Sequence, residues 1–173
     1  MSFLSKTLCL SAMLVTSIAL ASEARAGLLF SPDPNWREGE VVFPPYPQAA
    51  SLRQFPVSGA SRNRFFIDAD TLSVGTDGVV RFALVIQTPG GAENVTFEGI
   101  RCATGERRIY AIGRGERGEW SAARRSDWEP IRDNDYNRPR AALAFDFFCD
   151  GSAPPRSAAD ALRSLREAHR RLP

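Results

Sequence analysis

The stretch RFFIDADTLSVGTDGVVRFALVIQTPGGAENVTFEGIRC, residues 64–102, decides the fold. Its clearest strand covers residues 79–87, because side chains alternate between two faces along a β-strand. One face is entirely apolar and is formed by Val80, Phe82, Leu84 and Ile86. The other face is apolar apart from Arg81. This pattern predicts a central strand that is at least partly covered on both sides.

Two turn signals divide this stretch into antiparallel strands. Asp77-Gly78 favours a tight hairpin, since glycine adopts positive φ easily, and Pro89-Gly90-Gly91 forms the next turn. We expect Asp68 to cap a short helical turn over residues 68–72 by accepting a backbone N–H. The alternation of the returning strand, residues 94–102, slips at Gly99, which predicts a β-bulge there.

The sequence after residue 102 predicts more strands and a helix. Residues 107–113 and 119–122 have strand patterns, residues 124–140 are polar and irregular, and residues 141–149 are typical of either a helix or a strand. Ser157 begins a C-terminal helix with one narrow apolar face. The predicted fold class is therefore α+β: one domain over residues 63–173, with a mainly antiparallel meander of four to six strands and the C-terminal helix packed on it.

The segment before the sheet, residues 27–62, is rich in proline and is expected to be an extended arm. Proline fixes φ and removes a hydrogen-bond donor, so a helix or a central strand is disfavoured here. Four aromatic side chains are spaced to anchor the arm to the domain surface: Trp36, Phe43, Tyr46 and Phe55. The alternative, that residues 43–47 bind a proline-recognising module, is disfavoured because such modules are not expected in the periplasm.

The first 26 residues have the features of a secretory signal peptide. A short positively charged start precedes the apolar run of residues 8–21, and the small-x-small pattern Ala24-Arg25-Ala26 follows. Cleavage is expected after Ala26, with Ala21 as the alternative site. A retained anchor is disfavoured because the run is shorter than the roughly 20 residues of a membrane-spanning helix. We therefore predict a periplasmic protein without a stable membrane span, from which Cys9 is removed with the signal peptide.

The charge and the composition of the chain exclude several classes of function, and its cysteines predict a disulfide. Removing residues 1–26 changes the formal net charge from +2 to +1, so no strong field attracts nucleic acid. The remaining basic side chains are all arginines, which excludes a Schiff-base or P-loop lysine. The two remaining cysteines, Cys102 and Cys149, are expected to form a disulfide in an oxidising compartment, with two free buried thiols as the alternative.

Several strings in residues 36–165 resemble one known family. They are Phe65-Phe66-Ile67-Asp68, Leu72-Ser73-Val74-Gly75, Asp77-Gly78-Val79-Val80-Arg81 and, most specifically, residues 91–102, GAENVTFEGIRC. The chain is similar in these strings to the cryptic neisserial protein one-like family of exported bacterial proteins. This resemblance implies an envelope-associated protein and supplies no catalytic residue. The order of elements is also similar to that of the surface-adhesin protein E family, which would imply a helix-covered antiparallel sheet and adhesion.

Most catalytic and metal sites are excluded by composition. His169 is the single histidine and lies near the end of a polar helix, where a nucleophile–histidine pair has little support. A zinc site needs several His or Cys ligands, and both remaining cysteines are assigned to the disulfide. The glycines of residues 113–118 match G-x-G-x-x-G, but no helix follows them, so they predict a turn. We therefore predict no metal and no cofactor.

Carboxylate chemistry is the enzymatic alternative that remains. The candidate acids are Asp68, Asp70, Glu93 and Glu98, and two of them in one cleft would suit a hydrolase that acts on envelope glycan. Each acid also has a structural interpretation: Asp68 as a cap, Asp70 on a turn surface, Glu93 in a hairpin loop, and Glu98 in an ion pair with Arg101. Calcium binding by Asp68 and Asp70 is a further, weaker alternative.

The favoured function is non-enzymatic binding of an envelope protein or a cell-wall polymer. Its candidate binding face consists of Arg107, Arg108, Tyr110, Arg114, Trp120, Arg124 and Trp128. Arginine, tryptophan and tyrosine are enriched among the residues that dominate binding energy at interfaces. The equally weighted alternative is that the tryptophans belong to the core and the arginines solvate the surface.

Overall fold

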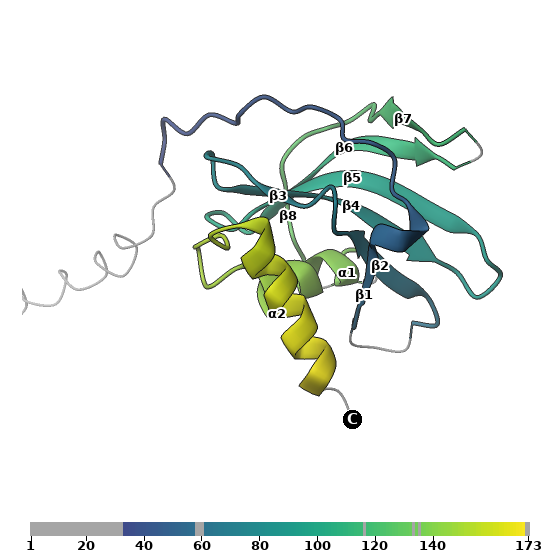
Figure 1. The fold of residues 1–173 in the computed structure, drawn as a ribbon. Coiled ribbons are helices and arrows are strands. Elements are labelled where there is room, and N and C mark those ends of the chain that lie inside the picture. Colours follow the sequence, from purple (N-terminus) through teal and green to yellow (C-terminus); the bar gives the residue numbers. More distant parts are fainter. Residues whose placement is uncertain (1–32, 58–60, 116, 133, 135, 172–173) are drawn as a thin grey trace, which may run out of the picture. The chain divides into compact units, whose positions relative to one another are not determined.

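The computed structural model describes residues 33–171, apart from residues 58–60, 116, 133 and 135, and side chains as far as residue 167 (Figure 1). The predicted signal peptide and its cleavage site lie outside these residues. No helix within the described part of the chain is long and apolar enough to cross a membrane.

An antiparallel sheet forms the centre of the domain, as predicted. Six strands follow one another in the order β1-β2-β4-β5-β6-β7, and the two-residue strands β3 and β8 pair with β4 and β6. The strands are β1 (Leu52–Phe55), β2 (Arg64–Asp68), β3 (Ser73–Val74), β4 (Val79–Gln87), β5 (Glu93–Arg101), β6 (Glu106–Arg114), β7 (Glu119–Ala122) and β8 (Glu129–Pro130). The edge strand β1 lies inside the segment that was predicted to be an extended arm, where proline-containing sequence is compatible with an edge.

The central strand β4 is buried on both faces, which confirms the expectation from its pattern. Val80, Phe82 and Leu84 belong to the main core, while Ala83 and Val85 are buried on the opposite side. The hairpin before β4 turns at Gly78, whose φ of 76° is accessible to glycine at no steric cost. The sequence pattern therefore identified both the strand and the reason for its two-sided burial.

The predicted β-bulge lies in a different strand. The register between β5 and β6 shifts at the step from Phe97 to Glu98, and the extra residue is Tyr110 of β6, because Phe97 pairs with Ala111 and Glu98 pairs with Ile109. Gly99 itself continues the alternation of β5. Its missing Cβ leaves room for the Tyr110 hydroxyl, which a Cβ at this position would overlap. Glycine is therefore needed at position 99 because the Tyr110 side chain lies close to the backbone of β5. Such a close approach is a second reason, besides a bulge, for glycine within a strand.

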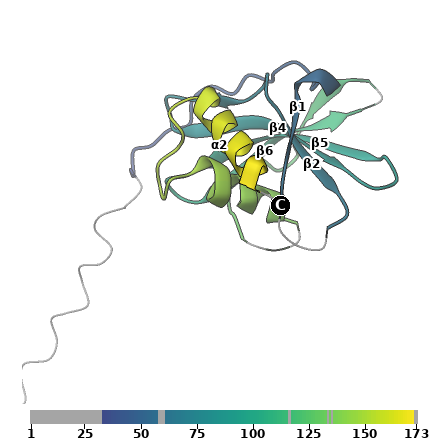
Figure 2. The same cartoon turned by 60° about the horizontal axis from the view of Figure 1, so that its bottom comes forward.

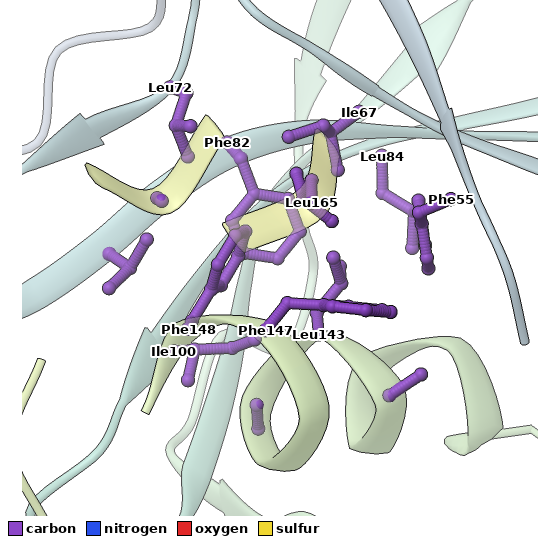
Figure 3. Close-up of a cluster of buried hydrophobic side chains, with 14 of the residues drawn as sticks. Phe55, Ile67, Leu72, Phe82, Leu84, Ile100, Leu143, Phe147, Phe148 and Leu165 are labelled. Carbon is purple, nitrogen blue, oxygen red and sulfur yellow. The ribbon is translucent and has the colours of Figure 1, made fainter. Parts of the chain in front are cut away.

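Helices cover one face of the sheet and complete the main core. The short helix α1 (Arg138–Ala141) continues into the π-helix η2 (Ala142–Phe148), and α2 (Ala158–Arg171) packs beside η2 (Figure 2). Ser157 accepts a hydrogen bond from the Asp160 N–H at 3.2 Å, which confirms the predicted helix start. The core side chains converge from the sheet and the helices, with Phe82 against Phe148 and Phe55 against Phe147 (Figure 3).

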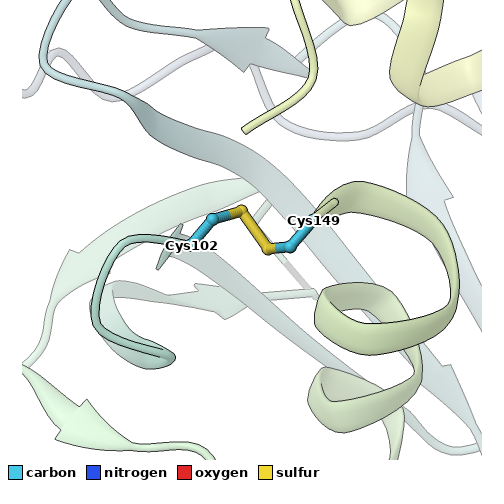
Figure 4. The surroundings of a disulfide bond; sticks show 2 residues. All are labelled: Cys102 and Cys149. Carbon is cyan, nitrogen blue, oxygen red and sulfur yellow. A yellow bond between two sulfur atoms is a disulfide. The ribbon is translucent and has the colours of Figure 1, made fainter. Parts of the chain in front are cut away.

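The Cys102–Cys149 disulfide is present and joins the end of β5 to the end of η2 (Figure 4). The two cysteines are 47 residues apart in the sequence. In the chain-entropy model a loop of this length stabilises the fold by about 4 kcal/mol. The bond therefore ties the helical layer to the central sheet.

Residues 33–48, here called the arm, lie on the sheet face opposite the helices (Figure 1). Val41 and Phe43 of the arm pack on a second cluster, formed by Phe97 of β5 and by Tyr110 and Ala111 of β6. It ends at the single turn η1 (Ala49–Ser51), which precedes β1. The arm thus covers part of β5 and β6 on this face, and its Glu38 reaches β4 through Arg81.

Candidate functional site

A groove with a volume of about 580 Å³ lies between helix α1 and the β4–β5 hairpin. Side chains of β2, β4 and β5 form one part of its lining, and the start of α1 forms another. The lining residues are Ser61, Asn63, Phe65, Ile86, Thr88, Asn94, Thr96, Tyr136, Arg138, Pro139 and Arg140. The groove therefore combines neutral hydrogen-bonding groups, apolar surface, one aromatic ring and two guanidinium groups.

A buried ion pair fixes the helical side of the groove to the sheet. Arg140 donates from Nε to Glu98 Oε2 at 2.8 Å and from Nη2 to Glu98 Oε1 at 2.5 Å. Thr96 donates its hydroxyl to the same carboxylate. Burial lowers the pKa of Arg140, but the charge and hydrogen bonds of Glu98 outweigh it, so this pKa is raised. The two-pronged geometry specifies the orientation of α1 on β5.

The same arginine positions the aromatic ring of the groove. Arg140 Nη1 donates to the backbone carbonyl of Tyr136 at 2.9 Å, and its guanidinium lies 4.9 Å from the centre of the Tyr136 ring. Arg107 lies 5.3 Å from the same ring and is itself held by Asn137 and Glu129. Tyr136 nevertheless remains 61% exposed. An aromatic ring that is positioned by buried groups and open to solvent is suited to contact a ligand.

Two amide side chains of the groove are available for hydrogen bonding. Within the described part of the chain, the side-chain amides of Asn63 and Asn94 have no hydrogen-bond partner. Each amide offers donors and an acceptor. Phe65 and Ile86, which are paired across β2 and β4, provide apolar surface between them and the helix. The sequence offered no signal for this site, because its residues come from four separated segments.

The four candidate acids have different partners in different parts of the fold. Asp68 is buried and accepts the Asp70 N–H at 3.2 Å, as expected of a cap, while Asp70 is exposed. Glu93 is exposed in the β4–β5 hairpin and accepts a hydrogen bond from Gln87. Glu98 pairs with Arg140. The described groove lining contains no Asp or Glu.

The expected ion pair between Glu98 and Arg101 is wrong. Residues three apart in a strand point to opposite faces, so Glu98 faces the helices and Arg101 faces the arm. Arg101 lies 3.8 Å from the centre of the Trp36 ring and 4.0 Å from the carboxylate of Glu106. A bulge at Gly99 would have placed Glu98 and Arg101 on the same face, which is why the pair was expected.

The candidate binding face is divided between the two faces of the sheet. Arg108, Tyr110 and Trp128 converge on one carboxylate of the arm, Glu38, which the sequence analysis did not single out. Trp120 donates its indole N–H to the carbonyl of Pro44 at 2.8 Å. Arg107 points to the helical face, whereas Arg114 bonds to Ser121 and Arg124 is exposed. Four of these seven residues, Arg108, Tyr110, Trp120 and Trp128, therefore hold the arm on the sheet.

Glu38 completes a buried network with Arg81 and Asp77. Arg81 donates to Asp77 at 2.5 Å and to Glu38 at 3.3 Å. Burial acts to raise the pKa of Asp77, but hydrogen bonds from Arg81, the Gly39 N–H and the Val79 N–H outweigh it and hold this pKa below its ordinary value. Burial also raises the pKa of Tyr110, and its hydrogen bond to Glu38 adds to the increase. The network therefore favours the ionised form of Asp77 beneath the arm.

A model of the CNP1-like family matches residues 31–166. Cryptic neisserial protein 1 of Neisseria gonorrhoeae (strain ATCC 700825 / FA 1090) is 25% identical over 134 residues, and the match covers 69% of this chain and 66% of that relative. The chain therefore spans slightly less than two thirds of the relative's length. No solved structure matches this chain.

Proposed function

We propose that this chain, which belongs to the CNP1-like family, is an exported periplasmic domain that binds envelope glycan in the groove beside α1. In this function the chain binds the glycan and does not cleave it. The observation that carries it is the lining of the groove, in which amide and hydroxyl side chains surround apolar surface and the exposed Tyr136 ring.

Glycans are recognised by this combination of groups. Their hydroxyl and acetamido groups need both donors and acceptors, which the side-chain amides of Asn63 and Asn94 can supply in the groove. The apolar faces of sugar rings stack on aromatic side chains, and Tyr136 is open to such a contact. A few placed polar groups on a largely apolar lining are also typical of small-molecule sites.

Export is supported by two features of the chain. The signal-like features of residues 1–26 precede the domain, and the Cys102–Cys149 disulfide is a bond that persists in oxidising compartments. The alternative of a carboxylate hydrolase lacks support, because paired catalytic acids must share one cleft. Three of the four candidate acids are occupied, as a cap, a hairpin contact and a buried ion pair, and the fourth, Asp70, is exposed outside the groove.

Calorimetric titration with soluble oligomers of N-acetylglucosamine and with peptidoglycan fragments tests the proposed function. We expect saturable binding to the wild-type chain and at least a tenfold loss in Tyr136→Ala and Asn94→Ala. Phe145→Ala is a matched control, since Phe145 is 58% exposed, close to the 61% of Tyr136, but does not line the groove. Equal loss in Phe145→Ala and Tyr136→Ala, or an absence of binding to every fragment, would overturn the proposal.

A further inference from the structure

The arm is held on the sheet as a peptide is held by a receptor. In the described residues no strand pairing links the arm to the sheet, and its attachment depends on side chains at three points. At the first point, Trp36 donates its indole N–H to the carbonyl of Asp77 at 2.8 Å and lies edge-on to Trp128. Arg101 stacks on the Trp36 ring at 3.8 Å.

The second point is a receptor for one carboxylate. Glu38 accepts hydrogen bonds from Arg108 and Tyr110 of β6, from Trp128, and from Arg81 of β4. Arg81 is also neutralised by Asp77, so the charge that Glu38 itself balances comes mainly from Arg108. Without Glu38, these donors would surround an unfilled anion site on a largely buried surface.

The third point accommodates proline and aromatic residues. Trp120 donates to the Pro44 carbonyl, and the rings of Tyr46 and Trp120 lie 5.2 Å apart. Phe43 packs against Phe97 with ring centres 6.2 Å apart. Indole N–H groups that bond to carbonyls of proline-rich segments, beside aromatic surface, are the general means by which extended proline-rich peptides are recognised.

We propose that this surface, formed by Asp77, Arg81, Arg101, Arg108, Tyr110, Trp120 and Trp128 and here called the arm seat, is a recognition site for an acidic peptide with proline and aromatic residues. Residues 33–48 are its ligand within one chain, and a second copy of the chain supplies the same ligand in trans. Exchange of an identical segment between copies costs little, because every contact made in one chain is made again between two.

Concentration decides between the two arrangements. A tethered arm has a high effective concentration at its own seat, so binding within one chain dominates in dilute solution. The intermolecular arrangement gains when the chain is concentrated, or when one copy has a vacant seat and another has an undocked arm. This inference concerns the face opposite the helices and is independent of the groove.

A mixture of two complementary full-length variants tests the exchange. Glu38→Ala weakens the arm and leaves the seat whole, whereas Arg108→Ala weakens the seat and leaves the arm whole. We expect analytical ultracentrifugation to detect a 1:1 complex in the mixture, at least tenfold tighter than the self-association of either variant. Arg114→Ala is the matched control for Arg108→Ala, because Arg114 is an exposed arginine of the same strand that bonds outside the seat. Absence of a complex in the mixture would overturn the proposal.

A labelled synthetic peptide of residues 33–48 provides a second measurement that keeps the test valid if Glu38→Ala does not fold. Its host is then full-length Glu38→Gln, which preserves the shape of the side chain. We expect the peptide to bind this host at least tenfold more tightly than the wild-type chain, whose seat is occupied. The same peptide with Glu38→Gln should bind at least tenfold more weakly. Equal binding of the two peptides would contradict a seat that recognises the carboxylate.

Discussion

Glu98 of β5 and Arg140 of α1, 42 residues apart in the sequence, form an ion pair whose side chains are 0% and 4% exposed. The pair joins the sheet to the first helix, and Arg140 also bonds the backbone of Tyr136. One buried contact therefore holds both the helical layer and the aromatic wall of the groove.

Removing one member of this pair should be strongly destabilising. We expect Glu98→Leu and Arg140→Met each to lower the free energy of unfolding by about 3–5 kcal/mol, because the charged partner left behind stays buried without its counterpart. The Glu98→Leu/Arg140→Met double variant should lose less than the sum of the single losses. Urea denaturation measures these values, and strictly additive losses would show that the two side chains are not coupled.

The pH dependence of stability should include a contribution from Asp77. Its pKa in the folded protein lies below the ordinary value of 3.8, so its contribution is present above that value and is lost as pH falls through the lowered folded pKa. We expect the wild-type chain to be more stable than Asp77→Asn near neutral pH and the difference to shrink on acidification below about pH 4. Thermal unfolding across this range measures it, and a constant difference would contradict the assignment.

Gly99 should be intolerant of even one methyl group. A Cβ here would overlap the Tyr110 hydroxyl and lie 3.0 Å from two atoms of its ring, so Gly99→Ala should cost about 1–3 kcal/mol through overpacking. Gly90→Ala is the control, because its Cβ would meet no atom closer than 4.0 Å. Denaturation of both variants checks the prediction, which fails if the two substitutions have equal effects.

Reduction of the disulfide should weaken the fold substantially. Opening the link between Cys102 and Cys149 should lower the free energy of unfolding by about 4 kcal/mol, because the unfolded chain regains the entropy of a long loop. Urea denaturation of the wild-type chain and of Cys102→Ala/Cys149→Ala measures the loss. Alkylation of the protein purified without reductant should find no free thiol at Cys102 or Cys149, and labelling of both cysteines would contradict the pairing.

Local patterns were sufficient to predict the main elements. The alternation of residues 79–87, the Asp77-Gly78 turn and the helix that starts at Ser157 all depend on interactions between neighbours in the chain. Such elements can be predicted from the sequence because strand periodicity, turn conformation and capping each involve only a few consecutive residues. The disulfide was also predictable, since the predicted domain contains two of the three cysteines, Cys102 and Cys149, and two cysteines allow one pairing.

The functional surfaces could not be predicted from residues that are neighbours in the chain. Arg107 and Arg108 are adjacent in the chain, yet one faces the helices and Tyr136 while the other reaches Glu38 from the opposite face. Glu38 and Arg108 are 70 residues apart. A single sequence does not reveal which distant groups will meet, because many pairings satisfy the same charges and only the packed fold selects one.

The sequence alone thus specified a disulfide-linked antiparallel sheet with a terminal helix. Strand periodicity and turn residues act between neighbours in the chain, and the two cysteines of the domain can form only one pair. The groove beside α1, the partner of Glu98 and the use of the arginine and aromatic residues as an arm seat were decided by tertiary structure. These features arise where segments from distant parts of the chain exclude water together, and burial then determines which polar groups must be paired.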